Sequence, residues 1–461
     1  MSFVILVLKW LLGIFVALVS TVLLTLYIRG AFRWRSLFHI EQALAPTDPR
    51  FPNFIKALSS SLQTQGTVLD FWDDADEIQH ARLDAIGRAE RTIQFETFMM
   101  TPGKRADDFA DAIIKKANEG VQVQLLVDSW GTRSLEDDYW KRLRAASVEV
   151  VFFNPFDWRA PANYAGRTHR KLLIIDDREA LIGGAGISNL WDGTEKSDDT
   201  QPWFDIEFLL QGEVIDLLST VFQMHWRGHK KHQRKGQKSQ NQVTCIDTYM
   251  IHGSNENTSK EDARKTDATD EKNTEEPSTI LIIPGTKPSY RSSPIETTKQ
   301  TLVASARERI WLSSPYFLPN MSTRNLLIEA QKNGVDVRIL TTSTRSDKKP
   351  VYYASYEVYG DLLKAGIQIY EYQPSMLHAK MLLIDNEWTN TGSANLDYRS
   401  FLHNDELDIL TNDQRLFAKI EQTFEKGFSQ SEQTTMREWR NRSWLKHRIL
   451  GNTVRLVQWQ L

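Results

Sequence analysis

The chain contains 461 residues, 41% of them hydrophobic and 25% charged, with a formal net charge of -3 and an isoelectric point near 6.4. This length and hydrophobic content exclude a disordered protein and leave room for two domains or for one duplicated unit with sizeable cores. The slightly acidic balance disfavours a general nucleic-acid binder, which usually carries an excess of basic residues.

The first predicted element is a transmembrane anchor within residues 1–40. Residues 3–28 are apolar apart from Lys9 and a few hydroxyl groups, and residues 10–28 alone are long enough to cross a bilayer as a helix. The run is apolar on every face, which disfavours a soluble helix, and the lack of a small-residue cleavage site disfavours a signal peptide. Three arginines follow the run and favour a cytoplasmic position for the rest of the chain: Arg29, Arg33 and Arg35.

Residues 41–228 are predicted to form a first α/β unit. Hydrophobic patterns indicate alternating strands and helices, and Gly120 is placed to end the helix between the first two strands. The predicted elements are a buried strand over residues 92–98, a helix over 106–118, a strand that alternates at 121, 123 and 125, and a strand over 148–153.

Residues 286–430 repeat the same order and form the second predicted unit. Ser293, Pro294 and Glu296 carry the pattern of a helix start, with a reciprocal cap between Ser293 and Glu296. The elements that follow are a strand over residues 310–314, a helix that includes 326–331 and ends at Gly334, a strand that alternates at 335, 337 and 339, and a strand over 367–372. The repetition predicts an α/β fold in which one unit, a mixed sheet flanked by helices, is used twice.

Two further segments differ in composition from the units. Residues 229–285 are predicted to be a polar, disordered linker or surface insertion, because 253–278 is almost entirely polar and lacks apolar periodicity. The basic run 229–238 suits either a solvated loop or a contact with anionic lipid headgroups. The tail, residues 431–461, interleaves basic residues with Trp and Leu, which suits either an interfacial segment on a membrane or a helix packed on the catalytic core.

The strongest functional signal lies near the C-terminal end of the second unit. His378 and Lys380 are two positions apart, so a strand there points both side chains to one face. Asp385 lies in the turn that follows, and a second short strand delivers Ser393 and Asn395. This set suits phosphate chemistry, because ammonium and amide donors hold anionic oxygens while an imidazole attacks phosphorus or moves a proton.

A second copy of this pattern lies in the first unit. His169, Lys171 and Asp176 have the same offsets as the residues above, and Gly183 corresponds to Gly392. Two independent matches are hard to attribute to packing, so both copies are candidates for catalysis.

The paired pattern of His-x-Lys, four residues and Asp resembles the phospholipase D superfamily, in which two half-sites meet in one active centre. The stretches at 313–320, 334–340, 365–380 and 392–407 are similar to bacterial cardiolipin synthases. The resemblance covers nearly the whole chain after the first forty residues. It implies two tandem phospholipase D-like α/β units that share one pseudo-twofold active site.

The resemblance also implies a role for each candidate residue. His169 is expected to be the nucleophile and His378 the acid and base, or the reverse. Glu406 follows His378 by 28 residues and is expected to orient it, and Asp205 is the counterpart of Glu406 in the first copy. The groups expected to bind the substrate phosphate are Lys171, Lys380, Ser393 and Asn395.

Two features of the motifs stay open. Asp176 and Asp385 belong to the pattern and either shape their turns or transfer protons. The first copy has Gly186 where the second has Asn395, so an amide donor is missing there. No clustered set of His, Cys or carboxylate residues predicts a metal site, and the single cysteine, Cys245, excludes a disulfide within the chain.

These expectations combine into a membrane-bound phosphatidyltransferase that makes cardiolipin from phosphatidylglycerol and a second phospholipid through a phosphohistidine. The chemistry requires no cofactor, and the expected partners are phospholipids and the membrane, with no nucleic acid. The expected location is the bacterial inner membrane, with a single-pass N-terminal anchor and the catalytic region in the cytoplasm. The alternatives are a hydrolytic phospholipase D that releases phosphatidic acid, a membrane-anchored nuclease, and a lapsed lipid-binding protein, which the two intact His-x-Lys pairs disfavour.

Overall fold

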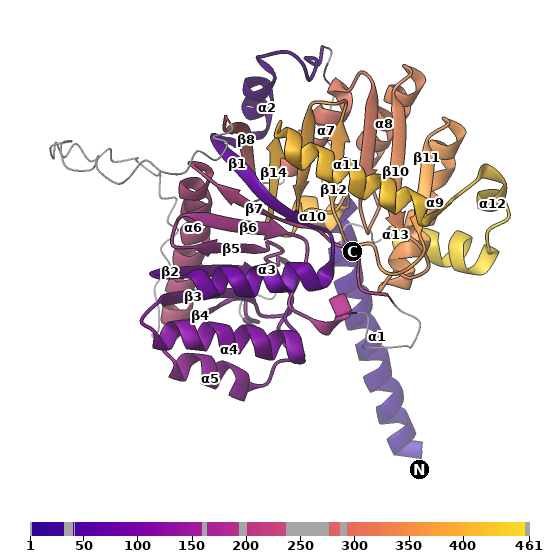
Figure 1. Ribbon diagram of the computed structural model, residues 1–461. Helices are drawn as coiled ribbons and strands as arrows, with labels where there is room; N and C mark the ends of the chain where they lie inside the picture. Colours follow the sequence, from indigo (N-terminus) through magenta and orange to yellow (C-terminus); the bar gives the residue numbers. More distant parts are fainter. Residues whose placement is uncertain are drawn as a thin grey trace.

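A single mixed sheet of 15 strands runs through the described part of the computed structural model, with helices on both of its faces (Figure 1). The structure describes residues 2–31, 40, 42–158, 164–192, 201–236, 276–285 and 293–456. The strands of the first unit are β1 (Leu62–Trp72), β2 (Thr92–Thr97), β3 (Gln122–Asp128), β4 (Glu149–Phe153), β5 (Leu172–Ile175), β6 (Glu179–Gly183) and β7 (Glu207–Gln211). Those of the second are β8 (Ser278–Gly285), β9 (Arg309–Ser313), β10 (Asp336–Thr342), β11 (Gln368–Tyr372), β12 (Met381–Ile384), β13 (Trp388–Gly392), β14 (Glu406–Thr411) and β15 (Ser431–Gln433).

The two units have the same strand order. From the middle of the sheet outward, the first unit runs β1-β7-β6-β5-β2-β3-β4, and the second runs β8-β14-β13-β12-β9-β10-β11 with β15 at its edge. The halves join where β1 and β8 pair antiparallel, with Leu62 opposite Ile282 and Gly66 opposite Ser278. This order confirms the predicted duplication and relates the units by a pseudo-twofold axis between β1 and β8.

Helices occupy equivalent places in the two units (Figure 1). In the first unit they are α3 (Ala75–Arg88), α4 (Lys104–Asn118), α5 (Asp137–Ala145) and α6 (Val214–Gly236), and in the second they are α7 (Pro294–Ser305), α8 (Met321–Lys332), α9 (Lys349–Lys364) and α11 (Gln414–Ser429). Each unit has one large hydrophobic core of its own, around Phe95 and Phe109 in the first and Phe317 and Tyr359 in the second. A third core contains side chains of both units, among them Phe208 and Ile409, so the units share one interior.

The strand that follows each His-x-Lys pair is buried on both faces, as its continuous apolar sequence requires. In β12, Leu382 and Ile384 belong to the core of the second unit, while Met381 and Leu383 belong to the shared core. The strand therefore has two apolar faces, one toward each core. The His-x-Lys residues themselves precede the strands, because β5 begins at Leu172 and β12 at Met381, so their prediction as strand residues is wrong by one to three positions.

The start of α7 is confirmed in part. The Ser293 hydroxyl accepts a hydrogen bond from the backbone N–H of Glu296 at 3.3 Å, and Pro294 occupies the first turn. The carboxylate of Glu296 instead accepts hydrogen bonds from the side-chain amides of Gln300 and Asn320. The predicted reciprocal cap is therefore replaced by a link between α7 and the Asn320 cap of α8.

The predicted linker, residues 229–285, is wrong at both ends. The helix α6 continues through the basic run as far as Gly236, and the ring of His229 lies 4.2 Å from that of Phe153. Strand β8 occupies 278–285 at the centre of the sheet, where it pairs with β1 and β14. Residues 237–275, which include most of the polar segment, lie outside the described residues.

The predicted start of the first unit at residue 41 is also too early. Helix α2 (Phe51–Ser59) packs against the second unit, with the rings of Phe51 and Trp388 5.5 Å apart. The Trp388 indole N–H donates to the carbonyl of Pro46 at 3.0 Å. The first unit therefore begins with β1, and the segment before it stabilises the second unit across a separation of more than 300 residues.

Helix α1 (Ser2–Ala31) projects away from the body of the protein (Figure 1). Its segment Val4–Thr25 has a mean hydropathy of 2.4, is entirely exposed, and is long and apolar enough to cross a membrane. The predicted long apolar helix is thus confirmed, and its crossing of a membrane stays a prediction. Arg33 and Arg35, on which the predicted orientation depends, lie outside the described residues.

Candidate active site

At the centre of the molecule, a short backbone segment of each unit pairs with a segment of the other unit. Thr168 forms a parallel bridge with Asp405, and Leu377 forms a parallel bridge with Phe204. The backbone N–H of His169 donates to the carbonyl of Asp405 at 2.8 Å, and that of His378 donates to the carbonyl of Phe204 at 2.7 Å. The two histidines are therefore fixed by the backbone of the opposite unit.

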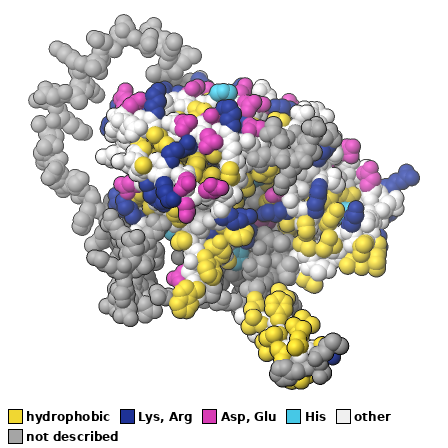
Figure 2. Space-filling model, turned by 90° about the horizontal axis from the view of Figure 1, so that it is seen from below, with side chains coloured by type: hydrophobic (Ala, Val, Ile, Leu, Met, Phe, Trp, Pro, Cys, Tyr) yellow, Lys and Arg dark blue, Asp and Glu magenta, His cyan; other side chains and the backbone are white. Residues whose placement is uncertain are grey.

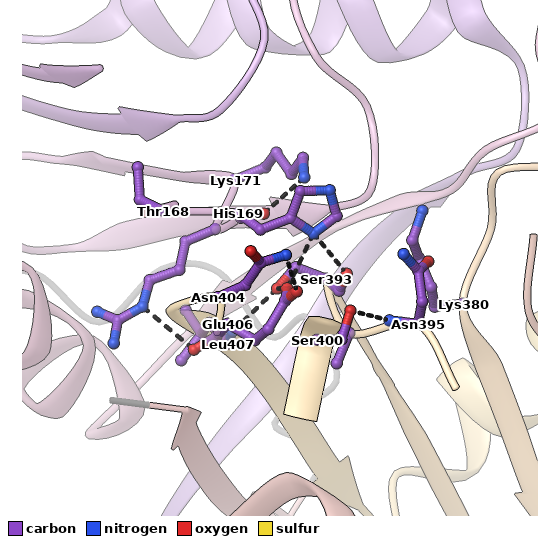
Figure 3. Close-up of polar contacts among 12 residues, drawn as sticks. Thr168, His169, Lys171, Lys380, Ser393, Asn395, Ser400, Asn404, Glu406 and Leu407 are labelled. Atoms are coloured by element: carbon purple, nitrogen blue, oxygen red, sulfur yellow. Dashed lines mark hydrogen bonds and ion pairs between the residues drawn. The ribbon is translucent and has the colours of Figure 1, made fainter. Parts of the chain in front are cut away.

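This exchange determines which carboxylate holds which histidine. The Nδ1 atom of His169 lies 2.9 Å from an oxygen of Glu406 (Figure 3), and the Nδ1 atom of His378 lies 2.7 Å from an oxygen of Asp205. The prediction that Glu406 orients His378 of its own unit, with Asp205 in the same role in the first unit, is wrong. The equivalence of the two carboxylates is preserved, because Gly183 pairs with Glu207 and Gly392 pairs with Asp408; only their partners are exchanged.

The two imidazoles face one another across the site. Their ring centroids are 6.5 Å apart, and each Nδ1 is engaged by a carboxylate, which leaves each Nε2 for chemistry. Both rings are buried, and their separation allows a single phosphoryl group between them to contact both. The pair has the arrangement of a nucleophile and an acid or base, each oriented by a carboxylate.

Two buried lysines complete the site. The ammonium of Lys171 donates to the carbonyl of His169 at 2.5 Å, and that of Lys380 donates to the carbonyl of His378. Asn395 lies beside Lys380 (Figure 3), and its side-chain oxygen is buried without a hydrogen-bond partner among the described residues. Ser393 is placed differently from the prediction, because its hydroxyl donates to Glu406 at 2.5 Å and accepts from the N–H of Leu407. Ser393 thus holds the carboxylate, while Asn395 remains able to contact a phosphate.

Burial changes the protonation of all these groups. Burial lowers the pKa of His169 to about 4 and that of His378 to about 3, in each case helped by the neighbouring lysines and opposed by the partner carboxylate. Burial also lowers the pKa of Lys171 to about 7 and that of Lys380 to about 8. At neutral pH both imidazoles are neutral and can use Nε2 as a nucleophile or base.

Aromatic rings line the site and were not predicted from the sequence. The ring of Phe98 lies 5.4 Å from that of His169, while Trp191 and Trp203 lie 5.6 and 5.7 Å from His378. The Trp191 indole also donates to Asp205 at 3.1 Å. The sequence feature that could have indicated Trp191 and Trp203 is their position before the candidate residue Asp205.

The same tryptophan explains why the first motif lacks the amide of the second. A side chain at Gly186 would meet the carbonyl oxygen of Met99 at 2.9 Å and the ring of Trp191 at 3.1 Å. A side chain at Gly184 would meet Asp205 at 2.1 Å. Trp191 and Met99 therefore occupy the space that a side chain at position 186 would need. The side-chain amide of the motif is present in the second half-site, at Asn395, and is missing from the first.

Each half-site also contains a buried ion pair that was not predicted from the sequence. In the first unit Arg82 binds Glu207 and donates to the carbonyls of Ala185 and Gly186. In the second unit Lys299 lies 2.9 Å from Asp408. Both cations come from the first helix of their unit, so the pseudo-twofold symmetry extends to the residues that fix the glycine turns.

Asp176 and Asp385 lie at the far ends of β5 and β12, roughly 16 Å of extended chain from the lysines. Asp176 accepts hydrogen bonds from the backbone N–H groups of Glu90, Arg91 and Thr92. Both residues have positive φ, near 55° and 53°. Of the two roles left open, the structure supports the turn and contradicts proton transfer, so including these residues in the catalytic set was wrong.

Replacing Asp385 with alanine is expected to destabilise the fold by about 2–4 kcal/mol, because the carboxylate accepts hydrogen bonds from three successive backbone N–H groups. Thermal unfolding in detergent measures the loss. Asp385→Asn, which keeps one acceptor oxygen and tolerates positive φ, should lose less. If folded Asp385→Ala protein had normal stability but no activity, the structural role would be contradicted.

Comparison with known proteins identifies the family. The family model described as "Cardiolipin synthase, PLD-like domain" matches residues 83–197 and 300–427, more than half of the chain. The chain belongs to this family. It is 30% identical to cardiolipin synthase 2 of Bacillus anthracis over 88% of this chain and 73% of that one. It is also 30% identical to cardiolipin synthase 1 of Staphylococcus epidermidis, over 82% of this chain and 71% of the relative.

A solved structure supports the fold. Phosphatidylserine synthase of Haemophilus influenzae superposes with a TM-score of 0.63 over 89% of this chain and 99% of its own, at 14% identity. The phospholipase D-like fold of two units is thereby confirmed. Family membership identifies the chain as an enzyme, a phosphatidyltransferase with phospholipid substrates.

Proposed function

We propose that this enzyme makes cardiolipin by moving a phosphatidyl group from phosphatidylglycerol to the hydroxyl of a second phospholipid. The observation that carries the proposal is the pair of buried imidazoles, each held at Nδ1 by a carboxylate of the opposite unit, with two lysines beside them. A transferase by way of a covalent intermediate needs one nucleophile and one acid and base on opposite sides of phosphorus, and the pair supplies both.

In the first step, Nε2 of His169 attacks phosphorus and the bond from phosphorus to the glycerol oxygen breaks. The bound phosphodiester anion favours proton uptake at the imidazoles, and His378 delivers this proton to the departing glycerol oxygen. Glu406 stabilises the positive charge that develops on His169. The products are a phosphatidyl-histidine and free glycerol.

In the second step, His378 removes the proton from the hydroxyl of the acceptor lipid, whose oxygen attacks phosphorus and displaces His169. Lys171, Lys380 and the amide of Asn395 hold the nonbridging oxygens, where negative charge grows in the transition state. Asp205 keeps His378 in the required tautomer. The enzyme returns to its starting protonation state.

The choice of lipid rather than water as acceptor is supported by the surroundings of His378. Trp191 and Trp203 lie against its ring, and the ring itself is buried. An apolar wall at this point disfavours water beside the base and favours an acceptor that brings its own apolar surface. Hydrolysis to phosphatidic acid is therefore the minor outcome.

The test is to incubate the purified enzyme with vesicles that contain labelled phosphatidylglycerol and to separate the lipids. Cardiolipin and free glycerol in equal amounts are the expected products. Phosphatidic acid as the main product would show that water is the acceptor.

The affinity for a phosphodiester lipid that cannot react is expected to fall with pH in a first stage set by Lys171. Because burial lowers the pKa of Lys171 to about 7, its charge is lost as pH rises through neutrality. Binding should weaken above pH 7 to 8, as Lys171 and then Lys380 lose their charge. Lys171→Arg should remove the first stage of this fall, since guanidinium stays charged; an unchanged fall in that variant would contradict the assignment.

We further propose that α1 anchors the enzyme in the bacterial inner membrane and that the catalytic body lies on the cytoplasmic side, as the arginines after the helix favour. The full chain should remain with membranes after alkaline extraction, and a protease added to right-side-out vesicles should not reach the body. A shortened soluble product would point to a cleaved leader, and digestion from outside would reverse the orientation.

A further inference from the structure

The C-terminal segment is held against the second unit by one side of its helices. The ring of Trp439 packs on Gly360, where a Cβ atom would come within 2.3 Å of it, and its indole N–H donates to the carbonyl of Tyr356 at 2.9 Å. In η3 (Trp444–Gly451), the ring of His447 lies 4.7 Å from that of Tyr356. These contacts fix the orientation of η3 and of α13 (Asn452–Leu456) on helix α9.

Beyond these contacts, the segment carries large apolar residues in solvent. The side chains of Trp444 and Leu445 are 65% exposed and that of Leu456 is 67% exposed. Lys446, Arg448 and Leu450 complete this surface, which we call the tail face: Trp444, Leu445, Lys446, Arg448, Leu450 and Leu456. The packing on α9 therefore does not explain why these apolar side chains are present.

The charged side chains at the end of the segment are all basic. No Asp or Glu occurs from residue 439 to the end of the chain, whereas the whole chain has a net charge of -3. Arg442 is neutralised by Glu357, but Lys446 and Arg448 lie on the tail face with no acidic residue in their own helix. The tail face is thus basic as well as apolar, on a protein that is acidic overall.

We propose that the tail face docks on the surface of an anionic bilayer, as a membrane contact separate from α1. Tryptophan and leucine side chains enter the headgroup region, while the long basic side chains remain with the anionic headgroups. A second copy of the chain is a poorer occupant, because a twofold interface would place the same basic residues opposite one another. The proposal does not depend on the reaction that the enzyme catalyses.

A second exposed aromatic pair lies in the first unit. Phe156 and Trp158 are 65% and 74% exposed. Figure 2, a view from below, shows separate groups of hydrophobic side chains on the face from which α1 projects, with Lys and Arg side chains among them. Contacts at α1 and at the tail face would restrain how the body tilts on the membrane.

The test uses the full chain reconstituted in vesicles, with Cys245→Ser removing its single cysteine. An environment-sensitive fluorophore on Leu445→Cys should shift to shorter wavelength and be quenched by nitroxide-labelled lipid when the vesicles contain phosphatidylglycerol. The same fluorophore on Leu58→Cys, which is 42% exposed on α2 at the top of Figure 1, serves as the control and should do neither.

The charged residues are tested in the same preparation. Adding Lys446→Glu and Arg448→Glu should lower the ratio of docked to undocked reporter at least about tenfold, because each basic residue near an anionic surface contributes on the order of fivefold. Signals at positions 445 and 58 that are equal in phosphatidylglycerol vesicles would overturn the proposal. An equal response at position 445 in purely zwitterionic vesicles would overturn it too, since the proposed partner is an anionic surface.

Discussion

Replacing His169 with asparagine is expected to lower cardiolipin synthesis by roughly 10⁴-fold or more, and His378→Asn is expected to have a similar effect. The asparagine amide can take the place of Nδ1 and keep the hydrogen bond to the partner carboxylate, so the fold is preserved while Nε2 is removed. The measurement is lipid product analysis with phosphatidylglycerol vesicles. His80→Ala is the matched control, because the ring of His80 is exposed and hydrogen-bonds to the backbone carbonyl of Asp76 in its own helix.

The two variants are expected to differ in product release when the substrate carries a good leaving group. With a nitrophenyl phosphatidyl ester, departure needs no proton, so His378→Asn should still release one equivalent of nitrophenol while His169→Asn should release none. A burst from His169→Asn and none from His378→Asn would reverse the assigned roles. No burst from either would contradict the covalent mechanism.

Glu406→Gln is expected to slow the nitrophenol burst by on the order of 10³-fold, whereas Asp205→Asn should leave the burst rate nearly unchanged and slow only the transfer to the acceptor lipid. The reason is the exchanged pairing, in which Glu406 stabilises charge on His169 and Asp205 serves His378. Both substitutions keep the size of the side chain and remove its charge. Stopped-flow measurement of the burst checks this prediction, and the opposite pattern would mean that each carboxylate serves the histidine of its own unit.

The exchanged pairing could not be derived from one sequence. The offsets within each motif are local, so His169, Lys171, His378 and Lys380 were found directly, and their duplication predicted two equal units. The partner of His169 lies 237 residues away, and it is selected by the bridge between Thr168 and Asp405. A contact of this kind depends on how the two units meet, which no local pattern encodes.

The helix α6 shows a different limit of sequence reasoning. Residues 229–236 are mostly basic, and their composition predicted part of a disordered linker, either solvated or in contact with lipid headgroups. Helix α6 instead continues through them from a part in which Phe222 and Trp226 are buried in the shared core. Helix α2 shows the same limit, since its proximity in sequence to the first unit placed it there. Its buried side chains Phe51 and Ile55 pack in the core of the second unit instead.

Asp176 and Asp385 are residues of the motif that have a structural role. Both belong to the repeated pattern, yet their carboxylates bind backbone N–H groups at the far ends of the strands. Part of a repeated motif can therefore be repeated because the fold requires it. The sequence alone left this choice open, and the hydrogen bonds decide it.

The most direct test of the composite site is to trap the covalent intermediate. His378→Asn protein is treated with a nitrophenyl phosphatidyl ester in the absence of acceptor lipid, denatured, digested and mapped by mass spectrometry. The predicted result is one phosphatidyl group on the imidazole of His169, which disappears in the double variant with His169→Asn. A phosphatidyl group on any other residue, or cardiolipin synthesis by the wild-type enzyme with no histidine adduct detectable at any stage, would contradict a single active centre in which His169 is the nucleophile.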